Sequence, residues 1–160
     1  MLKEAVCENA IAVDDTTLDA VYQCACKAYE GKYRYSGEEY ITHPLNVAIL
    51  LTELGVTADT VMAGLFCDVV SKGNCSNLEK ELPAGIWSIV KGLEAKQADE
   101  AIIVKLVERL HNMRTIKFMD EGKRAEKVKE TIEIYMPLAR RVGHRKLTEE
   151  LNNLALQYHV

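Results

Sequence analysis

Apolar residues recur every three or four positions along almost all of this 160-residue chain, which is the spacing of one face of an α-helix. No stretch alternates convincingly between apolar and polar residues over the length of a strand, and hairpin signals are missing. The length suits one ordinary hydrophobic core. We therefore expect an all-α fold, a compact multi-helix domain that spans residues 1–160.

Capping and terminating residues divide this pattern into segments. After a short N-terminal lead, Asp14 is expected to cap a helix that ends near Gly31, and Pro44 suits the first turn of the next. Segment 32–43 mixes glycine, polar and aromatic residues without periodicity, as a loop does. Further helices are expected over 44–54, from 57 or 60 to 70, and over 83–93, 98–118, 123–141 and 147–158, with a helical turn within 76–82.

The helix expected over 98–118 carries both a packing face and a chemical face. Aliphatic residues fall on one side, whereas Lys105, Glu108, Asn112 and Thr115 align on another. A carboxylate, an amide and a hydroxyl in one row can hold a cation or a polar ligand. The alternative is a solvated helix face, since amphipathic helices commonly have charged outer faces.

Asp68 stands out because it lies within an otherwise apolar run. Burying a carboxylate costs several kcal/mol unless it is paired or bound to a metal. We therefore expect a partner for Asp68, and the candidates are His43, Glu108, a cation, or Lys72 one helical turn further on.

Charge and cysteine content restrict the class of protein. A net charge of −4 argues against bulk nucleic-acid binding, whereas a local basic excess between residues 105 and 146 suits a small anionic ligand. The five cysteines are an odd number without a CxxC pair, so no disulfide framework is expected. With no signal peptide and no apolar stretch long enough to cross a bilayer, we expect a cytoplasmic protein.

Four segments resemble the hydrolase domain of the Rel/SpoT alarmone enzymes, which belongs to the HD superfamily. They are Gly37–Pro44, Phe66–Lys72, Lys105–Thr115 and Glu130–Gly143, and the resemblance covers roughly residues 15–155. It implies an all-α domain that binds Mn²⁺ and removes the 3′-pyrophosphate from (p)ppGpp in the stringent response. Because the synthetase domain of long members is absent from this sequence, the chain resembles the small stand-alone alarmone hydrolases.

The resemblance also implies a metal-binding set, which this chain matches only in part. His43 and Asp68 match, whereas Cys67 replaces the His of the family's His-Asp doublet and Glu108 replaces the second Asp. Both replacements can coordinate metals, but a thiolate favours Zn²⁺ over Mn²⁺. We expect a metal site that is weak, absent or switched to Zn²⁺.

The family's catalytic Glu-Asp pair, which positions and activates the attacking water, corresponds to Ser71 and Lys72. Neither a hydroxyl nor a protonated lysine serves as a general base near neutral pH. Lys72 could instead reach Asp68 and supply positive charge without a metal. The alternative is a surface lysine that points to water.

The nucleotide-binding positions are better matched. Arg34 and Ser36 correspond to an Arg-Lys-Ser signature in which the arginine stacks on guanine, with Tyr35 in place of the lysine. Matches to residues that meet the nucleoside and phosphates, or that complete the pocket wall, are Asn112, Thr115, Glu130 and Tyr135.

These matches lead us to expect a catalytically impaired hydrolase domain that binds a guanine nucleotide such as ppGpp. One alternative is a working hydrolase in which Cys67 and Glu108 ligate Zn²⁺ or Mn²⁺ and a metal-bound hydroxide attacks without a protein base. The other is a structural interaction domain with a vestigial pocket. The sequence identifies no protein partner.

Overall fold

The computed structural model describes residues 1–159, and within them helices are joined by turns and loops, with one isolated β-bridge between Tyr33 and Glu39. The expected all-α fold is confirmed. In chain order, the elements are α1 (Leu2–Glu8), α2 (Asp15–Ala28), α3 (Thr42–Leu51), η1 (Thr52–Leu54), α4 (Ala58–Gly64), α5 (Val69–Lys72), α6 (Leu78–Glu81), α7 (Ala84–Lys91), α8 (Asp99–Arg114), η2 (Ile116–Phe118), α9 (Glu121–Glu130), η3 (Thr131–Tyr135), α10 (Met136–Val142) and α11 (Arg145–Tyr158).

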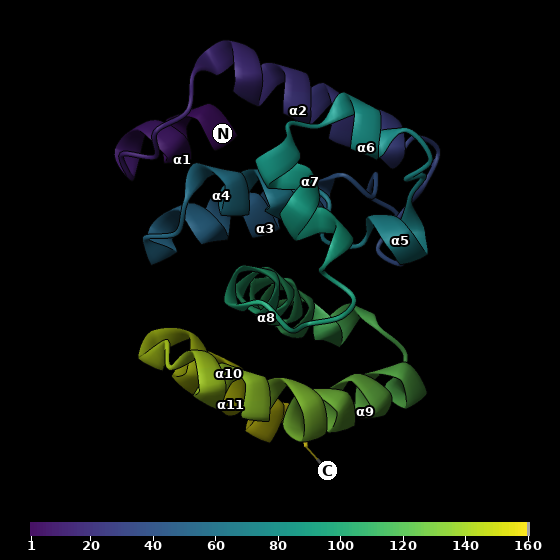
Figure 1. The fold of residues 1–160 in the computed structure, drawn as a ribbon. Coiled ribbons are helices and arrows are strands. Elements are labelled where there is room, and N and C mark those ends of the chain that lie inside the picture. The colour runs from purple at the N-terminus through teal and green to yellow at the C-terminus, as the bar shows by residue number, and fades with distance from the viewer. Residues whose placement is uncertain (160) are drawn as a thin grey trace.

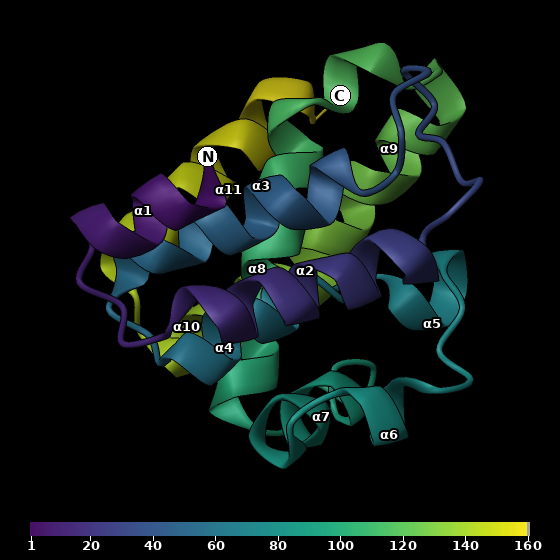
Figure 2. The same ribbon diagram turned by 90° about the horizontal axis from the view of Figure 1, so that it is seen from above.

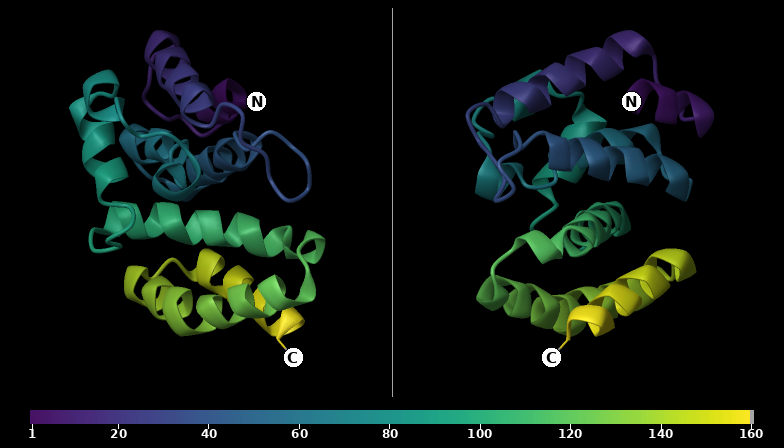
Figure 3. Two further views of the ribbon diagram at one scale, coloured as in Figure 1. Left: turned by 90° about the vertical axis from the view of Figure 1, so that its right-hand side faces the viewer. Right: turned by 180° about the vertical axis from the view of Figure 1, so that it is seen from behind.

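Helix α8 runs through the middle of the molecule, between a group that holds α1 to α7 and a group that holds α9 to α11 (Figure 1). It contacts α3, α4 and α7 on one side and α10 and α11 on the other. Figures 2 and 3 show the same arrangement from above, from the side and from behind. Ile102 and Leu106 of α8 are completely buried in the core. Because α8 packs against helices of both groups, residues all along it, from Ala101 to Met113, are buried.

The N-terminal segment forms α1, a helix that the sequence did not predict. Leu2 and Val6 are buried there, and α1 contacts α3. The next helix begins as predicted, since the Asp14 side chain accepts a hydrogen bond from the Thr17 backbone N–H at 2.7 Å. None of the described helices is long and apolar enough to cross a membrane, and all five cysteines are unpaired.

The prediction of one helix from residue 57 or 60 to residue 70 is wrong, because α4 ends at Gly64 and a turn precedes α5. In this turn the Cys67 N–H bonds to the carbonyl three residues back rather than four. The Asp68 N–H leaves the helical pattern and donates to the buried Tyr29 hydroxyl at 3.2 Å. The apolar spacing fits a continuous helix, so the break depends on this contact from α2. It places Cys67 and Asp68 in a turn.

A second irregularity interrupts the helix predicted over 123–141. The segment Thr131–Tyr135 is a π-helix between α9 and α10. Pro137 follows it in the first turn of α10, and a proline has no N–H to donate to the carbonyl one turn earlier. Such wide turns change the direction of side chains and are frequent near functional sites. Likewise, α8 ends at Arg114, before the predicted residue 118.

Candidate functional site

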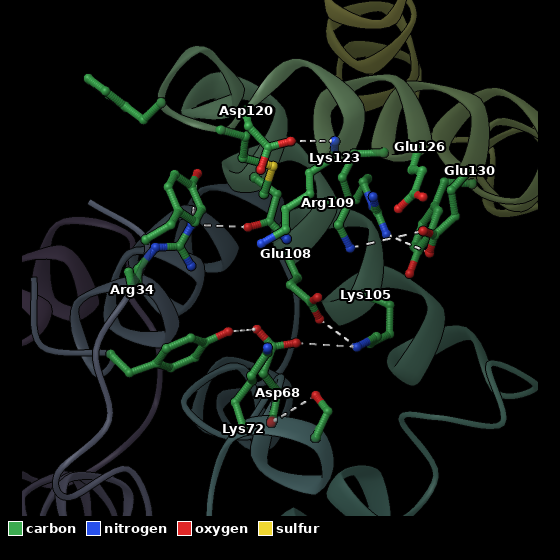
Figure 4. Close-up of a pocket in the computed structure, with 18 of the residues that line it drawn as sticks. Arg34, Asp68, Lys72, Lys105, Glu108, Arg109, Asp120, Lys123, Glu126 and Glu130 are labelled. Carbon is green, nitrogen blue, oxygen red and sulfur yellow. Dashed lines mark hydrogen bonds and ion pairs between the residues drawn. The ribbon is translucent and has the colours of Figure 1, made fainter. Parts of the chain in front are cut away.

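A cavity of about 710 Å³ lies between the loop over residues 33–40, the turn that holds Asp68, and helices α8 and α9. Figure 4 shows basic and acidic side chains from these elements that point toward one another across it. Tyrosines complete the wall, among them Tyr40 and Tyr135. The chemical face of α8 points into this cavity. The alternative of a solvated face is wrong for Lys105 and Glu108, which are each only 5% exposed.

Three of the four expected metal ligands come together at the inner end of the cavity. His43 lies in the first turn of α3, and Cys67 and Asp68 lie in the turn after α4. One potential ligand atom from each lies within 4.8 Å of the other two, and all three residues are buried. Glu108 stands nearby on α8 but outside this group.

Asp68 has protein partners on both carboxylate oxygens. The Tyr40 hydroxyl donates to Oδ2 at 2.7 Å, and His43 Nε2 lies 3.2 Å from the same oxygen. The Lys105 ammonium lies 3.7 Å from Oδ1. Burial alone would raise the pKa of Asp68, but the adjacent His43 and the charge of Lys105 outweigh it and lower the pKa. The carboxylate is therefore ionised.

The lysine that pairs with Asp68 is Lys105, not Lys72, which is exposed. Lys105 Nζ also lies 2.6 Å from Glu108 Oε2 and donates to the Cys67 carbonyl at 3.1 Å. Burial would lower the pKa of Lys105, but the two carboxylates raise it. Burial, followed by the charge of Asp68, raises the pKa of Glu108 well above its usual range. A protein cation thus stands between the two acidic groups of the expected metal set.

The donors His43, Cys67 and Asp68 fit a divalent ion that tolerates sulfur, such as Zn²⁺. His43 Nε2 supports the fit, because it is buried and makes no well-oriented hydrogen bond among the described residues. The ammonium of Lys105 opposes any such ion, since it repels a second cation. A protein cation therefore lies beside a group of donors that could hold a metal ion.

His111 is a contact of this site that sequence reasoning missed. Its Nδ1 lies 2.6 Å from Nδ1 of His43, so one ring must donate to the other. Burial, and then the neighbouring His43, lowers the pKa of His111 to about 4. His111 belongs to α8, but it lies one position before Asn112 and is therefore not in the polar row that the helical spacing identified. Its role is to fix the orientation of the His43 ring.

Five of the seven expected nucleotide-binding residues line two walls of the cavity, whereas Ser36 and Thr115 do not line it. Arg34 donates to the Asn112 side chain at 3.2 Å, and the Tyr35 hydroxyl lies 2.9 Å from Thr115 Oγ1. On another wall, Arg109 donates to Glu130 at 2.8 Å and lies over the Tyr135 ring at 4.2 Å. Ser36 is exposed and donates instead to Glu38 within its own loop.

Comparison with known proteins identifies the family, since residues 21–101 and 93–145 match the HD domain family. The chain belongs to the HD domain family. It is 35% identical over 162 residues to a GTP pyrophosphokinase of Streptomyces coelicolor, covering 86% of this chain and 19% of that protein. A guanosine-3′,5′-bis(diphosphate) 3′-pyrophosphohydrolase of Haemophilus influenzae is 35% identical over 156 residues, covering 81% of this chain and 23% of that protein.

The fold of this HD domain is also that of a solved structure, described as a metazoan ortholog of SpoT that hydrolyses ppGpp. The two superpose with a TM-score of 0.75 at 20% identity, over 91% of this chain and 96% of that one. The chain spans only about a fifth of the length of the curated relatives it matches. The resemblance to the Rel/SpoT enzymes that the sequence motifs indicated is confirmed.

In this HD domain the expected base positions lie at the cavity wall without a carboxylate. Ser71 and Lys72 belong to the single helical turn α5, and both line the cavity. The Ser71 hydroxyl donates weakly to the Asp68 carbonyl, with 3.4 Å between the oxygens. At these two positions the chain offers a hydroxyl and an ammonium, neither of which accepts a proton readily near neutral pH.

Proposed function

We propose that this HD domain binds a guanine nucleotide of the (p)ppGpp class and hydrolyses it poorly. Two relatives carry the names GTP pyrophosphokinase and guanosine-3′,5′-bis(diphosphate) 3′-pyrophosphohydrolase, which supports a guanosine polyphosphate as the ligand. The cavity is large enough for a ligand of that size. Its basic side chains suit the phosphates, and Arg34 and Asn112 suit the nucleoside.

The observation that carries the proposal is the position of the Lys105 ammonium. It lies 2.6 Å from Glu108 and 3.7 Å from Asp68, and so neutralises the acidic groups that would otherwise attract a metal ion. Ser71 and Lys72 leave the reaction without a positioned base. Both the metal and the base are therefore weakened in this proposal, while Arg34 and Asn112, assigned to the nucleoside, line the cavity.

A metal would be held by His43, Cys67 and Asp68, with Glu108 as a further donor once Lys105 releases it. When bound, it would supply Lewis acidity and lower the pKa of a water molecule. The protein's own contribution is to orient His43 through His111 and to hold the Asp68 carboxylate ionised. The grouping of three donor atoms within 4.8 Å supports the alternative of an active hydrolase with altered metal ligands.

The test compares binding with turnover in the same preparation. Calorimetry with ppGpp should give a saturable isotherm, while release of pyrophosphate with Mn²⁺ or Zn²⁺ present should stay near background. Turnover comparable to that of active relatives with either ion would establish the alternative hydrolase. An absence of binding by ppGpp, GDP and GTP would leave only the structural interaction domain.

A repaired variant locates the defect. Ser71→Glu with Lys72→Asp restores carboxylates at the base positions, and a general base typically contributes roughly 10²- to 10⁴-fold. Adding Cys67→His and Glu108→Asp should increase the recovered rate further. The two pairs should be coupled, because a base needs an ordered water and a metal needs a proton acceptor. If the variant with all four substitutions is no faster than the unmodified protein, these four residues are not the cause of poor hydrolysis.

A further inference from the structure

The loop over residues 33–40 folds back on itself as a narrow excursion beside the cavity. The Tyr33–Glu39 bridge closes its base, and the Arg34 N–H donates to the Glu38 carbonyl at 2.9 Å. Gly37 has a φ of 91°, which favours glycine and allows the tight reversal at the tip. This geometry presents Arg34 and Tyr35 to the C-terminal end of α8.

Tyr35 ties the tip of this loop to α8. Its hydroxyl donates to the Thr115 backbone carbonyl at 3.1 Å and lies 2.9 Å from Thr115 Oγ1. The hydroxyl also accepts from Arg34 Nη2 at 3.4 Å, and the same guanidinium nitrogen donates to Asn112 at 3.2 Å. The polar groups assigned to the nucleoside are thus already bonded to one another.

Two tyrosine rings lie close to the Arg34 guanidinium, which leaves little of it exposed. Its central carbon lies 5.1 Å from the centroid of Tyr35 and 5.7 Å from that of Tyr40, and Arg34 is only 9% exposed. A nucleobase can stack on Arg34 only if one ring leaves. Tyr40 is 8% exposed and bonded to Asp68, whereas Tyr35 is 43% exposed. Tyr35 is the ring that can move.

We propose that Tyr35 is a latch that closes the nucleobase end of the cavity when no nucleotide is bound. A nucleotide enters by displacing its ring from Arg34 and its hydroxyl from Thr115. This inference rests on the proposed function and adds that the chain itself closes the nucleobase end of the cavity.

The test uses Tyr35→Phe, which keeps the ring and removes both hydrogen bonds to Thr115. The matched control is Tyr33→Phe in the same loop, because Tyr33 is 64% exposed and its hydroxyl has no hydrogen bond among the described residues. Hydrogen exchange of the loop amides should be faster in Tyr35→Phe than in the control, without any nucleotide. Calorimetry should show ppGpp bound about 5- to 30-fold more tightly, the effect of releasing two modest hydrogen bonds.

Unchanged exchange in Tyr35→Phe would overturn the latch. So would faster exchange with unchanged or weaker binding, since weaker binding would mean that the hydroxyl contacts the nucleotide. If neither the unmodified protein nor either variant binds ppGpp, GDP or GTP, the proposed function fails, and the latch, which rests on it, is overturned too. Tight binding with equal exchange in all three proteins overturns the latch and leaves the proposed function intact.

Discussion

Replacing Lys105 by methionine should increase the affinity of the site for divalent metal ions. Methionine keeps most of the buried aliphatic volume and removes the ammonium. That ammonium lies 3.7 Å from Asp68 and 2.6 Å from Glu108, so it competes with any ion for the same oxygens. In the variant both carboxyl groups become available to the metal, and the repulsion between the two cations disappears.

The size of the effect follows from the charges. An ion bound to Asp68 would lie about 4 Å from the ammonium, where two unit charges interact by about 1 kcal/mol in water and about 4 kcal/mol at an effective dielectric of about 20. A divalent ion doubles these values. We take the lower figure of about 2 kcal/mol as the smallest expected gain, which corresponds to roughly 30-fold in the dissociation constant.

The assay is a titration of Zn²⁺ into metal-free protein in competition with a chromophoric chelator. Lys72→Met is the matched control, since Lys72 lines the same cavity but is exposed. Circular dichroism should first establish that both variants are folded. The reasoning is refuted if Lys105→Met binds Zn²⁺ no more tightly than the unmodified protein, or if Lys72→Met gains as much.

Three further outcomes are expected. Elemental analysis of the purified protein should find less than one equivalent of Mn²⁺ per chain, because Cys67 and Lys105 both disfavour that ion, and a full, tightly held equivalent would contradict this. Arg34→Ala should weaken ppGpp binding by about 1–2 kcal/mol in calorimetry, the scale of a partly desolvated cation–π contact, and unchanged affinity would exclude stacking on this arginine. Phe66→Ala should lower the free energy of unfolding in urea by about 3–5 kcal/mol, since Phe66 is completely buried, whereas Val70→Ala at a 58% exposed position should change it by less than about 0.5 kcal/mol.

Helical periodicity predicted most of the fold because most helices bury one regular stripe against the core. The pattern predicted α2 with its Asp14 cap, and it predicted that α8 has a packing face and a chemical face. It failed at the turn after Gly64, where Leu65, Phe66 and Val69 remain at helical spacing although the backbone leaves the helix. That turn is held by the Tyr29 hydroxyl, and no local pattern encodes a contact across 39 residues.

The same limit explains which parts of the site the sequence could identify. The need for a partner at Asp68 followed from the cost of burying a carboxylate, and the structure supplies His43, Tyr40 and Lys105. Lys72, one of the candidate partners, was considered on the assumption of a helix through Asp68, in which residues four apart face each other, and the alternative of an exposed lysine holds instead. Lys105 was visible three residues before Glu108 in the polar row of α8, but only the packing of α8 on the turn brings it to Asp68.

The two ends of the polar row of α8 serve different parts of the site. Glu108 and Lys105 face the Asp68 turn, whereas Thr115 meets the Tyr35 loop, and seven residues of helix separate Glu108 from Thr115 by roughly 10 Å. Substitutions that far apart without shared partners usually act additively. Adding Tyr35→Phe to Lys105→Met should therefore leave the gain in Zn²⁺ affinity unchanged, and in the metal-free Lys105→Met background it should raise the affinity for ppGpp by the same factor as in the unmodified protein. A departure of more than about 0.5 kcal/mol in either affinity would show that α8 transmits changes between its ends.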